Sequence, residues 1–461
     1  MADLTVTTTA IRGLLVLDLP LHGDARGWFK ENWQRAKMIA LGLPDFGPVQ
    51  NNMSFNATAG STRGLHAEPW DKLISLAHGR IFGAWVDLRP GENFGTSVTL
   101  AMGTDKAVFV PRGVANGYQA LEPDTVYSYL VNDHWSPEAR SSYTYLNLAD
   151  ETVAINWPIP LDQAEISAAD QSHPRLADVT PMTPKRTVVV GASGQLGQAL
   201  LRLFPEATPL RRPDFDVTDP ATFGAVPWSQ VGLIVNASAY TAVDAAETAE
   251  GRRDAWNVNV TGLGRLVEVA RAHRIPLVHV SSDYVFDGTI ESHTEDEPLS
   301  PLGVYGQTKA AGDALVATLP RQWIVRASWV IGDGNNFVRT MASLADRGVK
   351  PSVVGDQFGR LTFTSDLAAG IAHLVSSDAP AGTYNLTNSG PTMSWAGIAK
   401  RVFELRGRDA ADVTEVTTAE YFAGKTMAPR PIHSTLGLEK LQNIGFIPPD
   451  ADLRLVEYLS E

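Results

Sequence analysis

Residues 187–197 read TVVVGASGQLG, and this stretch decides the fold of the second part of the chain. It joins a run of β-branched residues to glycines at positions 191, 194 and 197, and QALLRLF follows with a helical pattern. Glycines between a buried strand and a helix permit a tight turn and let the helix N-terminus face a pyrophosphate. The stretch therefore predicts the first strand, the loop and the first helix of a dinucleotide-binding fold.

The sequence beyond this stretch alternates between strand-like and helix-like segments. Buried-strand patterns begin at Val231, Ile275 and Gln322. Between the first two, residues 263–270 place leucine, valine and alanine at the spacing of one helix face. Alternation of this kind predicts an α/β fold, with a doubly wound parallel sheet, over residues 187–461.

The sequence before residue 160 has a different pattern of apolar and turn-forming residues. Short strand-like runs are broken by Gly, Pro and Asn, as in KLISLAHG (from Lys72), RIFGAWVDLRPG (from Arg80), TSVTLAMG (from Thr96) and KAVFVPRG (from Lys106). Such runs with little helical periodicity predict an all-β sandwich or barrel over residues 1–175. The following HPRLADVTPMTPKR holds three prolines and no apolar period, which predicts a linker over residues 176–186.

The composition narrows the classes of protein and site that are possible. The chain contains no cysteine, which excludes disulfides, thiolate metal sites and thiol nucleophiles. Its net charge of −13 argues against a nucleic-acid partner, because nucleic acids are bound by clustered basic residues. No apolar run approaches the ~18 residues of a membrane span, and no apolar leader opens the sequence. We therefore expect a cytoplasmic protein with neither a membrane nor a nucleic-acid partner.

A second motif in the C-terminal part carries the chemistry. YGQTK places Tyr305 and Lys309 four residues apart at the start of a predicted helix, so both lie on one face. A lysine ammonium beside a phenol favours the phenolate, which makes the tyrosine a usable acid–base group. Ser282 ends the strand-like run IPLVHVSS and can donate to a substrate carbonyl. Together the three residues predict hydride transfer at a carbonyl carbon.

The cofactor preference is set at the end of the next strand. An acidic side chain there binds the ribose 2′-hydroxyl of NADH, whereas arginine suits the 2′-phosphate of NADPH. The sequence has Arg211 and Arg212 at this point, with Asp216 further on. The pattern favours NADPH, although two solvated surface arginines would give the same sequence.

Residues 187–461 resemble dTDP-4-dehydrorhamnose reductase, a family of extended short-chain dehydrogenases/reductases. The resemblance rests on YGQTK and on NASAYTAVDAAE (from Asn236), VNVTG (from Val258), SSDYVFDG (from Ser281), RASWVIGDGNNFVRTM (from Arg326), VVGDQFGRLT (from Val353) and RPIHS (from Arg430). It implies a Rossmann domain with a small C-terminal substrate-binding lobe. It also implies that Ser282, Tyr305 and Lys309 are catalytic, with Asp283 beside them.

The same resemblance implies two binding sets and the absence of a metal. The cofactor would contact Tyr305 and Lys309 together with Gly191, Ser193, Gly194, Gln195, Leu196, Gly197, Arg211, Arg212, Asp216, Val217, Ala237, Ala239 and Tyr240. The sugar nucleotide would contact Trp329, Asn336, Gln357 and Arg430. Some members of the family dimerise through a magnesium ion held by glutamates, but Gln198 and Ala199 stand in that region here. We therefore expect no metal.

The N-terminal part holds His66, in RGLH, and Lys72 six residues later. Such a pair is common, and a lone histidine is more often structural than catalytic. Its surroundings, however, resemble dTDP-4-dehydrorhamnose 3,5-epimerase over about residues 8–175, in DARGWFKE (from Asp24), QNNMS (from Gln50), VDLRPG (from Val86), VPRGVANGYQALE (from Val110) and SAAD (ending at Asp170). The resemblance implies a cupin-like fold, a double-stranded β-helix or jelly roll that needs no metal. It also implies a homodimer formed through this domain.

Epimerisation beside a ketone needs four groups, and the resemblance supplies a residue for each. Protons at C3 and C5 of a 4-keto sugar lie α to the carbonyl, so a base can remove them to form an enolate. His66 would be the base and Asp170 would orient it, while Lys72 would stabilise the enolate oxygen. Tyr129, in VYSYL, would return the proton from the opposite face. Substrate contacts would come from Arg26, Glu31, Gln50, Asn52 and Arg63.

Two positions depart from the epimerase pattern. Gly83 stands where the family has an aspartate, and Asn116 stands where it has a histidine. The segment between the base and the lysine is also shorter than usual. The two substitutions look like the joint loss of an accessory pair, which leaves open whether both carbons are epimerised.

Together these features predict a fusion of an epimerase with a reductase. dTDP-4-dehydro-6-deoxy-D-glucose would be epimerised and then reduced with NADPH, or with NADH, to dTDP-L-rhamnose. One alternative is a reductase whose N-terminal part is a mono-epimerase or an oligomerisation domain. A second is a non-catalytic regulatory protein, like the β subunit of methionine adenosyltransferase, which the intact Ser282, Tyr305 and Lys309 disfavour.

Overall fold

The computed structural model describes residues 3–377, 379–424 and 427–460. The chain divides into two compact units, Met1–Pro184 and Lys185–Glu461, each of which has cores of its own. Among the helices that the described residues form, none has the length and hydropathy needed to cross a membrane.

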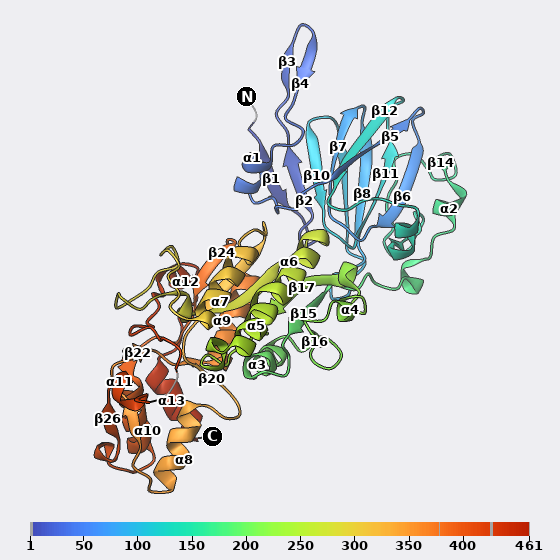
Figure 1. Ribbon diagram of the computed structural model, residues 1–461. Coiled ribbons are helices and arrows are strands. Elements are labelled where there is room, and N and C mark those ends of the chain that lie inside the picture. The colour runs from blue at the N-terminus through green and yellow to red at the C-terminus, as the bar shows by residue number, and fades with distance from the viewer. Residues whose placement is uncertain (1–2, 378, 425–426, 461) are drawn as a thin grey trace. The chain divides into compact units, whose positions relative to one another are not determined.

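The first unit is built almost entirely from β-strands (Figure 1). Its helices are short: α1 (Arg35–Ala40) and α2 (Ala168–Gln171). Its strands are β1 (Thr5–Thr8), β2 (Leu15–Asp18), β3 (His22–Asp24), β4 (Gly27–Phe29), β5 (Gln50–Asn56), β6 (Ser61–Ala67), β7 (Lys72–His78), β8 (Ile81–Asp87), β9 (Ser97–Met102), β10 (Lys106–Val110), β11 (Val114–Ala120), β12 (Thr125–Val131), β13 (Thr144–Tyr145) and β14 (Glu165–Ile166).

Two six-stranded sheets make up this unit. One has the order β1-β2-β10-β7-β12-β5, and the other has β13-β6-β11-β8-β9 with β14 paired to β6. Residues that alternate inward along the strands pack between the sheets, among them Ile74, Trp85, Val108 and Tyr127. This arrangement confirms the cupin-like all-β fold.

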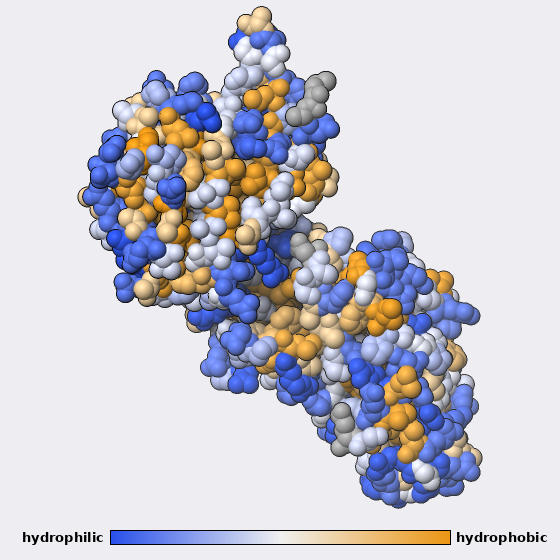
Figure 2. Space-filling view, turned by 180° about the vertical axis from the view of Figure 1, so that it is seen from behind, coloured by the Kyte–Doolittle hydropathy of each residue, from blue (hydrophilic) through white to orange (hydrophobic). Residues whose placement is uncertain are grey.

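The β3–β4 hairpin projects from the sheets of the first unit (Figures 1 and 2). It exposes Trp28 and Phe29. Strand β5 lies at the edge of its sheet and exposes Met53 and Phe55. The unit therefore presents large apolar side chains on two of its outer elements.

The second unit contains a parallel sheet with the strand order β16-β15-β17-β18-β19-β24. Successive side chains of a strand point to opposite faces, so Val188 and Val189 of β15 enter different cores. The core around Val189 includes Leu200 of α3 and Ile371 of α9, and the core around Val188 includes Leu266 of α6. Helices cover both faces, which confirms the doubly wound α/β fold.

The sheet strands of this unit are β15 (Arg186–Val190), β16 (Thr208–Leu210), β17 (Val231–Asn236), β18 (Leu277–Ser282), β19 (Gln322–Ala327) and β24 (Gly382–Asn385). The accompanying helices are α3 (Gln195–Leu203), α4 (Pro220–Phe223), α5 (Ala249–Trp256), α6 (Leu263–Ala272), α7 (Val304–Val316), α9 (Thr364–Ser376) and α12 (Glu439–Asn443). A π-helical turn, Asn257–Gly262, joins α5 to α6.

A smaller lobe with its own core follows the fifth strand of the sheet. Its helices are α8 (Phe337–Asp346), α10 (Trp395–Leu405), α11 (Thr418–Tyr421) and α13 (Ala451–Ser460). Its strands form three short pairs: β20 (Val330–Ile331) with β23 (Thr362–Phe363), β21 (Ser352–Val354) with β26 (Thr414–Val416), and β22 (Phe358–Gly359) with β25 (Met393–Ser394). The expected C-terminal lobe is thus present.

The segment predicted as a linker over residues 176–186 is ordered against the first unit for most of its length. Leu176, Val179 and Met182 are buried in a core of that unit, because these apolar side chains cover one of its sheets. Strand β15 begins at Arg186. The prediction of a free linker was therefore too long, and only the residues around Pro184 lie between the two units.

Candidate active sites

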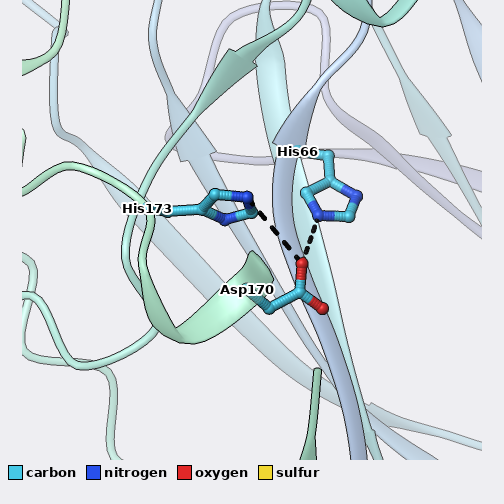
Figure 3. Close-up of side chains that lie close together, drawn as sticks. All are labelled: His66, Asp170 and His173. Atoms are coloured by element: carbon cyan, nitrogen blue, oxygen red, sulfur yellow. Dashed lines mark hydrogen bonds and ion pairs between the residues drawn. The ribbon is translucent and has the colours of Figure 1, made fainter. Parts of the chain in front are cut away.

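His66 and Asp170 form a directly bonded pair in the first unit. His66 lies on β6 and Asp170 on α2, whose N-terminus is capped by Ser167. His66 Nε2 lies 2.8 Å from Asp170 Oδ1, and Figure 3 shows the ring and the carboxylate pointing toward each other. Burial is the largest single influence on the pKa of Asp170 and raises it, but the hydrogen bond and the charge of His66, with a hydrogen bond to Ser167 and the charge of His173, together hold the pKa below its usual value. Asp170 is thus held as a carboxylate that orients the imidazole.

His173, which the sequence analysis did not single out, stands beside this pair. Its Nε2 lies 3.9 Å from Asp170 Oδ1, and its ring meets the ring of His66 edge-on (Figure 3). The ring of His173 also stacks on Tyr145 at 4.5 Å. Burial, with His66 as a second cause, lowers the pKa of His173. The ligand atoms of the two histidines and Asp170 lie within 4.8 Å of one another, close enough to hold a metal ion.

Lys72 lies on β7 with only 3% of its surface exposed. Its ammonium forms an ion pair with Glu68 Oε1 at 2.7 Å and donates a hydrogen bond to Asn116 Oδ1. Its Nζ is 5.5 Å from the ring centroid of Tyr129 on β12. Two of the predicted catalytic residues, Lys72 and Tyr129, are thus neighbours, and Glu68 is a contact that the sequence analysis missed.

Tyr129 is held as a neutral phenol. Burial, and then the charge of Glu68, raises the pKa of Tyr129 to about 12. Asn52 lies opposite Tyr129 in the β12–β5 pairing and donates a hydrogen bond to it. A protonated phenol is the form that can return a proton to an enolate.

The substrate-contact residues predicted for this unit fall into two groups. Gln50 and Asn52 lie on β5 and are hydrogen-bonded to each other at 2.7 Å, and Arg63 lies on β6 beside Asn56. Arg26, 90% exposed, lies at the tip of the β3–β4 hairpin with Asp24, and Glu31 pairs with Lys37. Among the described residues, no hydrogen bond or ion pair joins Arg26 or Glu31 to the His66 and Lys72 groups.

In the second unit, a cavity of about 580 Å³ opens at the carboxyl ends of the parallel strands. Its walls include ten of the predicted cofactor residues: Gly191, Ser193, Gly194, Arg211, Arg212, Asp216, Val217, Ala237, Ala239 and Tyr240. Gly191 has φ +77°, and a Cβ there would lie 2.7 Å from the Ser238 nitrogen, so the loop requires glycine. Asp254 and Asn257, beside the π-helical turn, also line the cavity and were not predicted.

Five predicted cofactor residues lie outside the cavity lining: Tyr305 and Lys309, and the three residues Gln195, Leu196 and Gly197 at the start of α3. Gln195 starts α3 and donates to Asn335 O, and Leu196 packs against a core of the sheet. A Cβ on Gly197 would lie 2.3 Å from Gly191 O, so this glycine allows the helix to approach the strand. In the structure Gln195, Leu196 and Gly197 thus make local packing and helix contacts, and their contact with the cofactor stays a prediction.

The predicted catalytic residues of this unit lie together. Ser282 ends β18, and Tyr305 and Lys309 lie on the first turns of α7. Ser282 hydrogen-bonds both Tyr305 and Asp283, the latter at 2.9 Å. Burial is the main cause that raises the pKa of Tyr305 to about 12 and that of Asp283 to about 6. Tyr305 is thus a neutral phenol, ready to donate a proton.

Lys309 is buried, and the buried Asp313, one turn further along α7, opposes the effect of burial on its pKa. Its Nζ donates to Val280 O at 2.7 Å and lies 3.4 Å from His279 Nε2. Burial lowers the pKa of Lys309 to about 8. His279 Nδ1 in turn lies 3.1 Å from the side-chain nitrogen of Asn236. Neither His279 nor Asn236 was predicted, although both belong to strands whose ends carry predicted site residues.

The four residues predicted near the sugar nucleotide have separate surroundings. Trp329, with φ +45°, stacks on Trp395 at 3.7 Å, and Asn336 caps α8. Gln357 donates to Thr418 Oγ1, while Arg430 pairs with Asp244 at 2.8 Å. Among the described residues, no hydrogen bond joins two of the four.

Comparisons with known proteins match the two units separately. The family model "RmlD substrate binding domain" matches residues 185–461, and "dTDP-4-dehydrorhamnose 3,5-epimerase" matches residues 8–178. The "Protein RmlC homolog" of Streptococcus pyogenes serotype M6 is 51% identical over 180 residues, which are 38% of this chain and 90% of that protein. The dTDP-4-dehydrorhamnose reductase of Aggregatibacter actinomycetemcomitans is 36% identical over 283 residues, which are 57% of this chain and 94% of that protein.

A solved structure matches the second unit. It is the dTDP-4-dehydrorhamnose reductase of Bacillus anthracis str. Ames in complex with NADP, 31% identical with a TM-score of 0.56. The match covers 60% of this chain and 100% of that one. The chain therefore belongs to two families at once, the dTDP-4-dehydrorhamnose 3,5-epimerases through its first unit and the RmlD reductases through its second.

Proposed function

We propose that this chain is a bifunctional enzyme that converts dTDP-4-dehydro-6-deoxy-D-glucose to dTDP-L-rhamnose. The first unit epimerises C3 and C5, and the second reduces the C4 ketone with NADPH. The observation that carries the proposal is that both catalytic groups are assembled in one chain. The His66–Asp170 and Lys72–Tyr129 neighbours stand in one unit, and Ser282, Tyr305 and Lys309 stand in the other.

The residues of the first unit suit proton transfer beside a ketone. His66, oriented by Asp170, removes the proton from the α carbon, and the electrons of that bond move to the C4 oxygen. The Lys72 ammonium stabilises the resulting enolate oxygen. Tyr129, held neutral by burial, returns a proton to the carbon from the other face. The same cycle at the second α carbon completes the 3,5-epimerisation.

The residues of the second unit suit reduction of the ketone. The nicotinamide cofactor, when bound, supplies the hydride that C4 accepts. Gly191 and the N-terminus of α3 fit a pyrophosphate, and Arg211 and Arg212 flank the same cavity. Ser282 donates to the carbonyl oxygen, and Tyr305 transfers its proton to that oxygen as hydride arrives. Lys309 stabilises the phenolate that remains.

One incubation tests the overall reaction. The purified protein is mixed with dTDP-4-dehydro-6-deoxy-D-glucose and NADPH in D₂O, and the product is identified by NMR. dTDP-L-rhamnose with deuterium at both C3 and C5 supports the proposal. Deuterium at one carbon supports a mono-epimerase, an outcome that Gly83 and Asn116 keep open. Reduction without exchange would leave only a reductase with a structural partner.

The preference for NADPH rests on Arg211 and Arg212. A charged hydrogen bond contributes about 1.5–3 kcal/mol, so the Arg211→Ala/Arg212→Ala variant should lose at least about tenfold in kcat/KM for NADPH. The value for NADH should not change, since NADH has no 2′-phosphate. Equal values for the two cofactors in the natural protein would show that the arginines are merely solvated.

We propose that neither reaction needs a metal, because Lys72 supplies the positive charge at the enolate and Tyr305 the proton at the alkoxide. The ligand set of His66, Asp170 and His173 makes this worth testing. Dialysis against EDTA should leave exchange and reduction unchanged. Loss of exchange that Zn²⁺ or Mn²⁺ restores would instead identify these residues as a metal site.

We also propose a cytoplasmic homodimer formed through the first unit. Its support is the exposed apolar surface on β5 and on the β3–β4 hairpin. Arg26 and Glu31 lie on or beside this hairpin, so a second copy is what they could contact. Met53→Lys with Phe55→Lys should yield a monomer in sedimentation velocity. An unchanged dimer would place the interface elsewhere.

A further inference from the structure

Glu68 is a buried carboxylate in the first unit to which neither family resemblance nor sequence pattern gives a role. It lies in the short connection between β6 and β7, with 8% of its surface exposed. Its Oε1 forms the 2.7 Å ion pair with Lys72, and its Oε2 accepts a hydrogen bond from Trp70 Nε1 at 2.5 Å. Both oxygens are thus engaged, and one of them holds the lysine that faces the enolate.

The opposite side of Lys72 is held by Asn116. The ammonium donates to Asn116 Oδ1, and the Asn116 amide donates to Tyr127 OH at 3.1 Å. The amide group is thereby oriented with its oxygen toward the lysine. Glu68 and Asn116, from different parts of the chain, together fix the position of Lys72 Nζ.

The space beside position 83 explains why the carboxylate comes from this connection. A Cβ on Gly83 would lie 2.4 Å from Cη2 of Trp85, whose ring is buried in the core. No side chain can extend from position 83 while that ring is there. An aspartate would not fit at this position while the ring is there, and the carboxylate that contacts Lys72 is that of Glu68.

The second unit shows what a buried lysine does without such a partner. Lys309 is as buried as Lys72, but among the described residues it forms no ion pair, and burial lowers its pKa to about 8. A carboxylate in contact favours the charged form of a buried lysine. Glu68 therefore places a carboxylate in direct contact with the Lys72 ammonium, a contact that Lys309 lacks.

We propose that Glu68 is the positioning residue of the epimerase site, which holds Lys72 Nζ toward the enolate oxygen. The proposal rests on the proposed epimerase function. The charged and titratable groups that surround this contact are Glu68 itself, Arg63 from β6, Tyr118 from β11, Tyr127 and Tyr129 from β12, Tyr143 and Tyr145. The charge of Glu68 is the second cause, after burial, that raises the pKa of Tyr129 and of Tyr143.

The test is Glu68→Gln in the full chain, measured by deuterium exchange at C3 and C5. Glutamine keeps the shape and the hydrogen bond from Trp70 but loses the charge. Displacing a reacting group by about 1 Å can cost about 10²-fold, so exchange should fall by about 10- to 10²-fold in kcat with KM nearly unchanged. The basic limb of the pH profile should also move to lower pH, because the charge of Glu68 raises the pKa of Tyr129 and its loss lets the phenol release its proton more easily.

Controls separate this role from a structural one. Glu165→Gln removes an exposed carboxylate of the same unit that binds Thr58 and Ser61, and it should change neither rate nor pH profile. The reductase activity of the same chain reports the amount of folded second unit, and near-UV circular dichroism reports the packing of the first. A purely structural role would lower the amplitude of exchange without moving the pH limb.

The outcomes distinguish the two proposals. No exchange in the natural protein would end the epimerase function and the role of Glu68 with it. Exchange in the natural protein that Glu68→Gln leaves unchanged in rate and pH limb would overturn the role of Glu68 alone. If Glu68→Gln does not fold, the ¹⁵Nζ resonance of Lys72 in the natural protein decides. Lys72 that loses its proton below pH 9 would show that Glu68 does not hold the ammonium.

Discussion

Each unit of the molecule contains one buried lysine beside a tyrosine, but the two lysines have opposite surroundings. Lys72 contacts the Glu68 carboxylate and the Asn116 amide oxygen. Lys309 contacts a backbone carbonyl and an imidazole, and its pKa falls to about 8. Burial is nearly equal, at 3% and 2% exposed surface. The two lysines therefore differ in the groups that contact each ammonium and not in how deeply each side chain is buried.

The two reactions require different properties of a lysine. An enolate needs a fixed positive charge throughout its lifetime, which an ion-paired ammonium supplies. A reductase needs a group that stabilises the phenolate of Tyr305 and then allows its reprotonation, for which a lysine that titrates near neutral pH is suited. A carboxylate in contact favours the charged form of a buried lysine, whereas the neutral groups that Lys309 contacts leave it able to titrate.

The largest expected effect comes from removing each lysine in turn. Lys72→Met should lower deuterium exchange by about 10²- to 10³-fold, the usual cost of losing an oxyanion partner. Lys309→Met should lower hydride transfer by about 10²-fold or more, the scale of losing acid–base assistance. Each variant should leave the other activity intact, and both are measured on the same preparation. A variant that loses both activities would show that the two sites are not independent.

The sequence sufficed for both folds because their signals are local. The strand, glycine loop and helix of residues 187–203 adjoin in sequence, and the YGQTK spacing places two catalytic groups on one helix face. His66, Lys72 and Tyr129 were identified by resemblance, because contacts between distant strands leave no local pattern. The predicted linker was too long because the local signal in its sequence was misleading. Three prolines suggested a free segment, but Leu176 and Met182 are buried.

The residues that sequence reasoning missed are those defined by partners. Glu68 looks like any charge in a loop until its contact with Lys72 is seen. His279 and Asn236 lie in buried strands, and in the sequence a polar residue at such a position can be mistaken for the end of the strand. The signal that could have found them is a polar residue inside an apolar strand, since a buried polar group needs a hydrogen-bond partner.

The next effect is on the pH dependence of reduction. The folded pKa of Lys309 is depressed, so Lys309 is charged below pH about 8 and neutral above it. Because the charged form stabilises the Tyr305 phenolate, kcat/KM for NADPH should fall as the pH rises through about 8. This parameter reports the free enzyme, and its value at pH 9 should be about tenfold below the plateau. A profile that is flat to pH 10 would contradict the assignment.

Asn236→Asp sharpens this prediction. The Ser238 backbone and hydroxyl donate to Asn236 Oδ1, so its amide nitrogen faces His279 Nδ1. His279 then carries its proton on Nε2, toward Lys309, which favours the neutral amine. An aspartate would accept from Nδ1, leave Nε2 free to accept from the ammonium, and move the pH limb up. In the double variant Asn236→Asp/His279→Gln, the pH limb should return toward its position in the natural protein. A double variant shifted as far as Asn236→Asp alone would indicate a simple charge effect of the aspartate.

The smallest effect is expected from separating the two lysine sites. The units have separate cores, and the chain between them is free only around Pro184. Trypsin should therefore cut first after Lys185 or Arg186, at a boundary with few contacts. Fragments 1–184 and 185–461, produced separately, should keep their own exchange and reduction rates within about twofold, since independent sites act additively. The mixed fragments should convert the 4-keto sugar nucleotide at the rate that the two activities give independently.

If fragment 1–184 loses exchange while it keeps its near-UV circular dichroism, the epimerase site needs the reductase unit. The Lys72 ammonium would then not be held by Glu68 and Asn116 alone, and the contrast between the two lysines would no longer follow from their partners.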